Sequence, residues 1–337
     1  MRTDPSRVRA GAAAGVLEGV RIRKGSVARV LQAAGLSSLE LEDPDRFIEL
    51  ARLVLLFHHA AEDTGDESFG LRVGANFDLG ALGALSYTVL HAPTVGTGLR
   101  NLHRYARTHV RGAELSVVTN ADTASLQYGI DVLDSSLRRQ NVEAVATTGV
   151  QLMQVLVGQH WRPSSVLFQH SRPRSLKEHR RILRSRVRFD QPVNALCFDA
   201  RDLSLAVPHA DLQLLPIVEE HLSSALEAAD DAQAWLHDVR TVVARALCNG
   251  HPTARETAKQ MGVSVRTLQR RLLDHQLVFR GLVAETRREI ALRYLRESSA
   301  SLGEISMLLG YSEVSAFVRA FRRWTGSTPG QIRAAHE

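Results

Sequence analysis

The sequence predicts an α+β domain followed by an all-α domain in which a long linker helix joins two helix-turn-helix motifs. Three observations support this fold class. One helical pattern occurs twice near the C-terminus, at a constant offset of 48 residues. The hydrophobic spacing between residues 114 and 132 changes from helical to short runs of β-forming residues. The net charge of +6 lies entirely from residue 251 onward, where 14 basic residues outnumber 8 acidic ones.

The first domain is expected over residues 20–215, and the Ala/Gly/Arg-rich residues 1–24 are expected to be loosely ordered. The glycine-rich segment 69–84 lacks the lysine and the strand-to-helix context of a phosphate loop, so close packing of backbones is the favoured interpretation. Helical spacing predicts helices over residues 25–41, from Pro44 to about Asp63, and from Pro93 onward.

A β-hairpin is predicted over residues 114–119 and 124–132, and a long amphipathic helix follows with apolar positions from Val142 to Val157. This order of strands and helices indicates a mixed α+β domain. The remaining elements expected in it are a strand over 164–169, a helix over 176–183, and a strand with a loop over 187–198.

A helical linker is expected over residues 216–250, made of two helices, 217–228 and 233–247, that are broken at residues 229–231. A turn over Gly250–Pro252 then leads into the second domain, residues 251–335.

The repeated pattern in the second domain has the order of a helix, a tight turn and a second helix. Each copy opens with a capping box and continues with a small residue where two helices can cross. A glycine then ends the first helix, and a serine is placed to cap the second. The pairs are Thr253 and Ser301, Ala258 and Ser306, Gly262 and Gly310, and Ser264 and Ser312. Residues 279–298 between the copies predict a helix of roughly 30 Å, close to the ~34 Å between successive major-groove openings.

The second helix of each copy leaves polar side chains outside its apolar stripe, and Arg and Gln are suited to the edges of guanine and adenine. Leu268 and Leu272 mark the inner face of the first of these helices, and Phe317, Phe321 and Trp324 mark that of the second. The candidate DNA-binding residues are Ser264, Arg266, Thr267, Gln269, Arg270 and Arg271 in the first copy, and Glu313, Val314, Ser315, Arg319, Arg322 and Arg323 in the second.

This final quarter of the chain resembles the DNA-binding domain of the AraC/XylS family of bacterial transcription regulators. The residues that carry the resemblance are Ala258, Gly262, Ser264, Leu268, Arg270, Arg288, Ala291, Leu295, Ile305, Leu309, Gly310, Tyr311, Ser315, Phe317, Arg319, Phe321, Gly326, Pro329 and Arg333. Ser306 and Ile332 depart from the family pattern at packing positions. The resemblance implies that Arg266, Arg270, Val314, Ser315 and Arg319 face the bases.

The first domain is similar to the arabinose-binding-type sensory domain of a subset of these regulators. The similarity rests on residues 80–87, 93–96, 187–198 and 208–211. It implies a domain that binds a small-molecule effector.

An arginine-rich segment between Arg172 and Arg188 offers two interpretations. It is either a solvated helix face or an anion site in which Arg180 and Arg184 bind a carboxylate or phosphate. An anionic effector is therefore ranked above a neutral sugar, and contact with the DNA backbone is a further alternative.

Several classes of site and protein are disfavoured by the sequence. Cys197 and Cys248 cannot form a disulfide framework or a cysteine-rich zinc site, and they fit a cytoplasmic protein. His58 and His59 are adjacent on a helix and are not expected to form a joint metal site. No secretory signal, membrane span or catalytic motif is recognised.

The sequence thus predicts a one-component transcription regulator without a cofactor or metal, whose partners are promoter DNA and a small effector. RNA polymerase and a second copy of the chain, bound through the N-terminal domain, are left open as further partners. Two alternatives also remain: a ligand-independent repressor or architectural protein, and an enzyme domain fused to a DNA-binding module.

Overall fold

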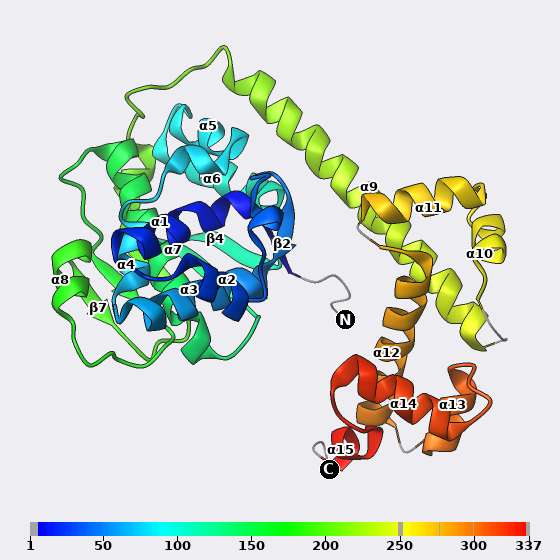
Figure 1. Cartoon of the computed structure of the whole chain (residues 1–337). Coiled ribbons are helices and arrows are strands. Elements are labelled where there is room, and N and C mark those ends of the chain that lie inside the picture. The colour runs from blue at the N-terminus through cyan, green and yellow to red at the C-terminus, as the bar shows by residue number, and fades with distance from the viewer. Residues whose placement is uncertain (1–5, 249–251, 276, 299, 335–337) are drawn as a thin grey trace. The chain divides into compact units, whose positions relative to one another are not determined.

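The computed structural model describes residues 6–248, 252–275, 277–298 and 300–334 of the 337-residue chain (Figure 1). The chain divides into two compact units, Met1–Leu226 and Glu227–Glu337. The expected turn at Gly250–Pro252 lies largely outside the described residues. None of the helices within the described ranges is both long and apolar enough to cross a membrane.

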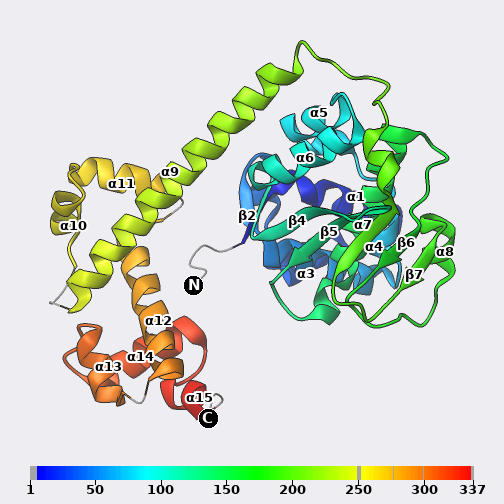
Figure 2. The same ribbon diagram turned by 180° about the vertical axis from the view of Figure 1, so that it is seen from behind.

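The N-terminal unit contains two sheets and a set of helices (Figure 2). Its strands are β1 (Arg7–Arg9), β2 (Phe47–Glu49), β3 (Val110–Arg111), β4 (Ala113–Thr119), β5 (Thr123–Ile130), β6 (Ser165–Leu167), β7 (Arg186–Arg188) and β8 (Asn194–Asp199). Its α-helices are α1 (Ala14–Ile22), α2 (Val27–Ala33), α3 (Leu50–Thr64), α4 (Phe69–Gly74), α5 (Ala84–Leu90), α6 (Val95–Tyr105), α7 (Ser135–Val157), α8 (Lys177–Leu183) and the start of α9 (Leu215–Cys248). Short 3-10 helices are η1 (Ala10–Ala13), η2 (Ser38–Leu41), η3 (Leu79–Leu82), η4 (Ala106–Thr108) and η5 (Ala200–Ser204).

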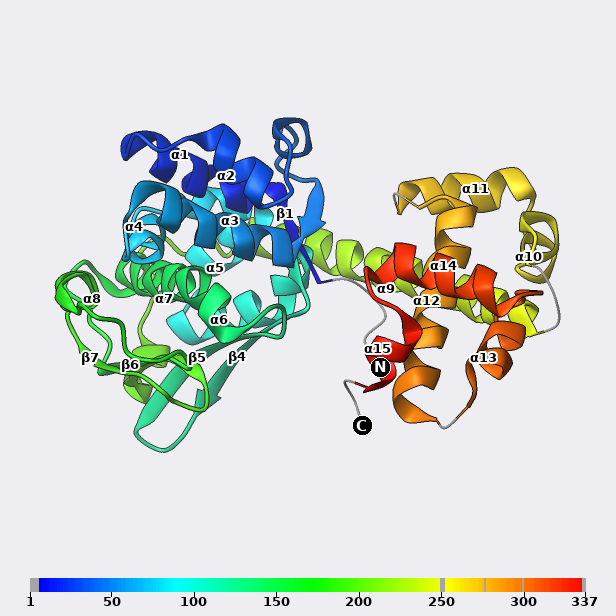
Figure 3. The ribbon, with the colours of Figure 1, turned by 60° about the horizontal axis from the view of Figure 1, so that its bottom comes forward.

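The larger sheet has the strand order β4-β5-β8-β6-β7, in which only the β6–β7 pair is parallel. The predicted hairpin is confirmed as β4 and β5, and the backbone N–H of Asn120 donates to the Thr123 carbonyl at 2.8 Å to close it. Helix α7 lies between this sheet and the layer of α3 and α4 (Figure 3). The predicted α+β architecture is therefore confirmed.

Two glycines of the predicted close-packing segment let α4 touch the backbone of α7. A Cβ atom on Gly70 would lie 1.9 Å from the carbonyl oxygen of Gln140, and one on Gly74 would lie 2.0 Å from that of Ala144. Both distances are far below van der Waals contact, so no larger residue fits without separating the helices. The interpretation as close backbone packing is confirmed at Gly70 and Gly74, but not at Gly80 and Gly83, where an added Cβ would meet only side-chain atoms.

Four predictions for the first hundred residues are wrong in their order or bounds. The helix predicted over residues 25–41 is divided into α2 and η2, because Gly35 takes a φ of +68° after α2. Residues 6–22 are ordered, because β1 pairs with β2 and β3 and thereby buries Val8 between Ile48 and Val110. Helix α3 begins at Leu50 instead of Pro44, since residues 47–49 belong to β2. Helix α6 begins at Val95 instead of Pro93, because the Thr94 hydroxyl caps it by accepting from the Thr97 N–H at 3.2 Å.

The C-terminal unit is all helical, and α12 joins its two helix-turn-helix motifs (Figure 1). Its helices, after the second half of α9, are α10 (Ala254–Gln260), α11 (Val265–Asp274), α12 (Phe279–Glu297), α13 (Leu302–Leu308), α14 (Val314–Thr325) and α15 (Pro329–Ala334). Helix α12 contributes to both hydrophobic clusters of the unit: Leu282 packs with the first motif, and Ala291 and Leu295 pack with the second. The predicted double motif is confirmed.

The predicted break at residues 229–231 is wrong, because α9 runs without interruption from Leu215 to Cys248. The segment contains no glycine, and its only proline is in the first turn, so the two aspartates there are not enough to end a helix. The second half of α9 is also more than a linker. Leu236, Val239 and Val243 are buried in the core of the first helix-turn-helix motif.

Candidate nucleic-acid interface and effector cavity

Helix α11 is built to present one polar face. Gly262 takes the positive φ of +66° that ends α10, and the Ser264 hydroxyl then caps α11 by accepting from the Thr267 N–H at 3.1 Å. Leu268 and Leu272 are fully buried beneath the helix. The opposite face therefore carries the exposed side chains of Arg266, Gln269, Arg270 and Arg271.

The predicted DNA-binding residues of α11 differ in their surroundings. Arg266 and Arg270 form no ion pair with any described residue. Arg271 instead lies over the indole ring of Trp235 on α9, with its guanidinium carbon 5.4 Å from the ring centre. Thr267 is half-buried, and its hydroxyl lies 2.8 Å from that of Ser264. Arg266, Gln269 and Arg270 are thus exposed on this face.

Helix α14 presents the corresponding face of the second motif. Phe317 and Phe321 are fully buried, as predicted, and Trp324 is half-buried. The predicted cap at Ser312 is wrong: α14 begins one residue later than the offset implies, because Glu313 keeps an extended backbone and occupies the N-cap position. The six predicted DNA-binding residues on this motif are all exposed, namely Glu313, Val314, Ser315, Arg319, Arg322 and Arg323.

The turn of the second motif is held by an arginine that the sequence pattern did not single out. The Arg287 Nε donates to the Leu309 carbonyl at 3.0 Å, and its guanidinium lies 5.0 Å from the centre of the Tyr311 ring. Gly310 between them takes a φ of +74°. At the start of the motif Ser301 and Glu304 form the complete predicted capping box. In the first copy, Thr253 caps α10 by accepting from the Glu256 N–H at 3.2 Å.

Of the two predicted effector-binding arginines, only one lines the polar groove beside α8. Arg180 and Arg184 are both exposed. Arg184 lines an open polar groove with Arg23, Arg72, Arg162 and Arg181, whereas Arg180 does not line it. Asp66 and Glu178 already pair with three of these groove arginines: Arg23, Arg72 and Arg181. The arginine and lysine side chains of the segment between Arg172 and Arg188 are all exposed, so this segment lies at the surface of the unit.

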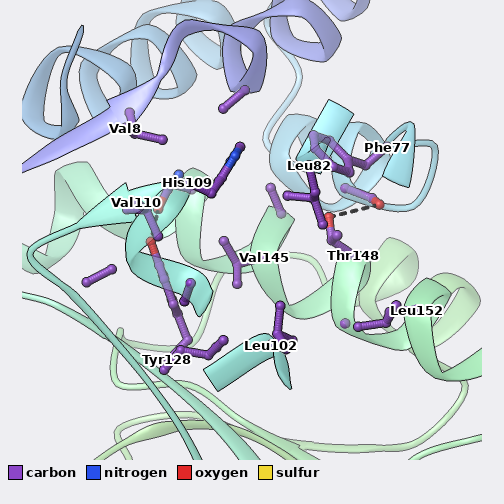
Figure 4. A pocket seen from close by; sticks show the side chains of 18 of the residues that line it. Val8, Phe77, Leu82, Leu102, His109, Val110, Tyr128, Val145, Thr148 and Leu152 are labelled. Atoms are coloured by element: carbon purple, nitrogen blue, oxygen red, sulfur yellow. Dashed lines mark hydrogen bonds between the residues drawn. The ribbon is translucent and has the colours of Figure 1, made fainter. Parts of the chain in front are cut away.

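A different site lies inside the N-terminal unit, as an apolar cavity of about 180 Å³ (Figure 4). The N-terminal unit has two hydrophobic clusters, and the cavity is lined from both. Val8, Leu53 and Phe57 come from the cluster around α3, and Leu102 and Leu152 come from the cluster around the sheet. The cavity lies where these two clusters meet. The lining has almost no polar surface.

Four side chains supply the polar groups of the cavity. The Tyr128 hydroxyl donates to Asn141 Oδ1 at 3.3 Å, and the Thr148 hydroxyl donates to the Gly74 carbonyl at 3.2 Å. His109 is 8% exposed, and its buried Nδ1 has no hydrogen-bond partner. Burial, with a smaller effect of Arg9, lowers the pKa of His109 to about 4, so its imidazole is neutral at physiological pH. The cavity is thus uncharged, with one unsatisfied polar atom.

No sequence pattern indicates this cavity, because its lining comes from strands, helices and loops between Val8 and Leu152. A lone histidine between η4 and β3 carries no recognisable motif.

His58 and His59 are adjacent on α3, yet both reach one carboxylate, so their adjacency does not keep the two rings apart as expected. His58 Nε2 lies 3.3 Å and His59 Nδ1 lies 2.9 Å from the oxygens of Glu62, because the carboxylate one turn later is within reach of both rings. Both imidazoles are partly exposed at the surface of α3.

Comparison with known proteins gives two family matches. Residues 25–207 match the arabinose-binding domain of AraC transcription regulators, and residues 257–335 match a helix-turn-helix domain. The chain is 31% identical over 293 residues to the HTH-type transcriptional regulator VirS of Mycobacterium tuberculosis, covering 86% of this chain and 85% of that protein. It is 25% identical over 295 residues to the ornithine utilization regulator of Pseudomonas aeruginosa, covering 88% and 87%. The solved structure of the transcriptional regulator CdpR from Pseudomonas aeruginosa is 20% identical, with a TM-score of 0.40 over 79% of this chain and 86% of that one.

Proposed function

Because the chain belongs to the AraC family of effector-regulated, DNA-binding transcription regulators, we propose that α11 and α14 read two adjacent major grooves of a promoter. The observation that carries this proposal is the pair of helix-turn-helix motifs, each with exposed arginines, at the two ends of one continuous helix. The 19 residues of α12 span roughly 28 Å at helical rise. This length is compatible with the ~34 Å between successive major-groove openings on one side of DNA.

The base-reading roles are assigned to Arg266 and Arg270 on α11 and to Val314, Ser315 and Arg319 on α14. These side chains are exposed or half-exposed, and the three arginines make no ion pair among the described residues. Their guanidinium groups are therefore available for bidentate contact with guanine. Arg271 is assigned a phosphate-contacting or packing role, because Trp235 already holds its guanidinium. Arg322 and Arg323, in the last turn of α14, are assigned to the phosphate backbone.

Control by an effector is assigned to the cavity of the N-terminal unit. Helix α6, which supplies Leu102 to the cavity, also contacts the first part of α9. Asn101 Nδ2 donates to Glu219 Oε1 at 2.8 Å, and the Tyr105 hydroxyl lies 3.2 Å from that of Ser223. A ligand that shifts α6 would therefore change contacts of α9, whose second half packs beneath the first motif. These contacts and the cavity favour an effector-controlled regulator over a ligand-independent one.

The same proposal places the protein in the bacterial cytoplasm, where promoter DNA is found. It also includes two partners, a second copy of the chain and RNA polymerase. Support for the second copy comes from β4, an edge strand of the five-stranded sheet with a partly exposed Val118. Edge strands offer unpaired backbone groups to another strand.

The test is hydroxyl-radical footprinting on a duplex selected from a random pool by the full-length protein. We expect two protected patches about 10–10.5 base pairs apart on one face of the DNA. Arg270→Ala should weaken one patch first, and Arg319→Ala should weaken the other. A single patch that responds equally to both substitutions would contradict the assignment of one groove to each helix.

A further inference from the structure

We propose that the cavity at the junction of the two hydrophobic clusters binds a neutral, largely apolar small molecule that carries one hydrogen-bonding group, and that His109 receives this group. The inference rests on the proposed function, in which the N-terminal unit takes an effector, and it specifies the site and the chemical class. It replaces the anionic effector expected from the arginine-rich segment.

The first support is the unsatisfied polar atom. Buried polar groups in folded proteins are almost always hydrogen-bonded, and an exception indicates a missing partner or a function. His109 lines the apolar cavity, as Val110 and Leu102 also do (Figure 4), and its Nδ1 is buried. A ligand hydroxyl or carbonyl placed beside Nδ1 would satisfy it. The imidazole can be donor or acceptor there, depending on its tautomer.

The second support is the absence of a positive charge from the lining. The side chains that line the cavity include no lysine or arginine, and His109 is neutral at physiological pH. Arg9, the nearby cation on β1, is engaged elsewhere: its Nε donates to the Thr108 carbonyl at 2.9 Å and its Nη1 pairs with Asp45. An anion would lose its hydration in the cavity without gaining a counter-ion, which is strongly unfavourable. The lining therefore selects a neutral ligand.

The third support is size and position. An engineered apolar cavity of roughly 150 Å³ takes up benzene, so the present cavity of about 180 Å³ accommodates a substituted benzene or an aliphatic molecule of similar bulk. Because the cavity separates Leu53 and Phe57 on one side from Leu102 and Leu152 on the other, a ligand would contact both clusters at once. Filling it should stabilise the N-terminal unit as a whole.

Three para-substituted toluenes of similar shape test the proposal on the full-length protein: p-cresol, p-xylene and p-toluate. At pH 7 the phenol is neutral and the carboxylate is ionised. Ligand-observed NMR titration gives their affinities. We expect p-cresol to bind about tenfold more tightly than p-xylene, which corresponds to about 1.4 kcal/mol for one hydrogen bond. Binding of p-toluate should be weaker than that of p-cresol by on the order of a hundredfold or more.

Variants locate the binding site. Val145→Phe on α7 fills the cavity and should abolish binding of p-cresol, whereas Val155→Phe on the same helix, where the side chain is 40% exposed, should leave it unchanged. His109→Phe should remove the tenfold advantage of p-cresol over p-xylene while both still bind. If a variant fails to fold, the order of the three probes on the wild-type protein still decides the question.

The proposal is overturned if p-toluate binds as tightly as p-cresol, if none of the probes binds, or if Val145→Phe folds and binds p-cresol normally. Specific DNA binding is measured on the same wild-type preparation. A protein that binds its selected duplex but none of the probes would refute the cavity assignment alone. A protein that binds p-cresol but no specific DNA would refute the proposed function instead.

Discussion

Replacing Arg270 by alanine tests the assignment of α11 as a base-reading helix. Arg270 is exposed and forms no ion pair with a described residue, so its removal should change the stability of the protein by no more than about 0.5 kcal/mol. A bidentate contact with guanine contributes about 1–3 kcal/mol of discrimination. The dissociation constant for the selected duplex should therefore rise roughly 5- to 150-fold.

Arg271→Ala is the matched control on the same helix. Its guanidinium lies over the ring of Trp235, and such a cation–π contact stabilises a protein by about 0.5–1 kcal/mol at an exposed site. We expect a small loss of stability and an equal change in affinity for the selected and the random duplex.

Fluorescence anisotropy with both duplexes at several salt concentrations distinguishes the two roles. Loss of a phosphate contact reduces the salt slope by about one and weakens binding uniformly, whereas loss of a base contact affects the selected duplex. Equal losses on both duplexes for Arg270→Ala would show that this residue contacts phosphate, and the base-reading assignment would be withdrawn.

Two further predictions concern the N-terminal unit. Gly74→Ala should destabilise it by about 1–3 kcal/mol or more, since the new Cβ would lie 2.0 Å from the Ala144 carbonyl oxygen. The control is Gly15→Ala in α1, which should be neutral or mildly stabilising because its Cβ meets Val73 at 3.6 Å. Urea unfolding measures both variants, and equal effects would contradict close packing at Gly74. The pKa of His109 is lowered to about 4 from an ordinary 6.5, so between pH 4 and pH 6.5 the unfolded chain binds more protons than the folded one. The free energy of unfolding is therefore unaffected above pH 6.5 and falls by roughly 3 kcal/mol toward pH 4. Comparing unfolding of wild type and His109→Phe across this range checks it, and identical pH profiles would show that His109 is not buried as a neutral ring.

The sequence was most informative where chemistry is local. The double helix-turn-helix is defined by repeated caps, small residues and turn glycines. Each of these residues determines only the conformation of its near neighbours in the sequence. Prediction from the sequence fails where a structure depends on contacts between distant residues. The order of residues 6–22 depends on pairing between Val8 and Ile48, which are 40 positions apart. The outward faces of α11 and α14 were predicted residue by residue, but the stacking of Arg271 on Trp235 could not be, since it depends on where α9 packs.

The candidate effector site illustrates the same limit. The arginine-rich segment was a candidate because its arginines are close together in the sequence. In the structure these side chains are exposed, and Arg181 is paired with Glu178. The cavity lined by His109 could not be predicted from the sequence, because the fold brings its lining together from distant segments. Apolar spacing predicts which side chains are buried, but it does not predict a space between them.

The most direct test of the central claim, that the two motifs read adjacent grooves, is a change in the spacing of the selected site. The continuous α12 of 19 residues packs with both motifs, so a constant separation of α11 and α14 is expected. Inserting five base pairs between the two protected patches turns one patch to the opposite face of the duplex. If the two motifs read adjacent grooves, footprinting should then show protection of one patch only, and affinity should fall to the level of a single motif. Retention of both patches at undiminished affinity would contradict it.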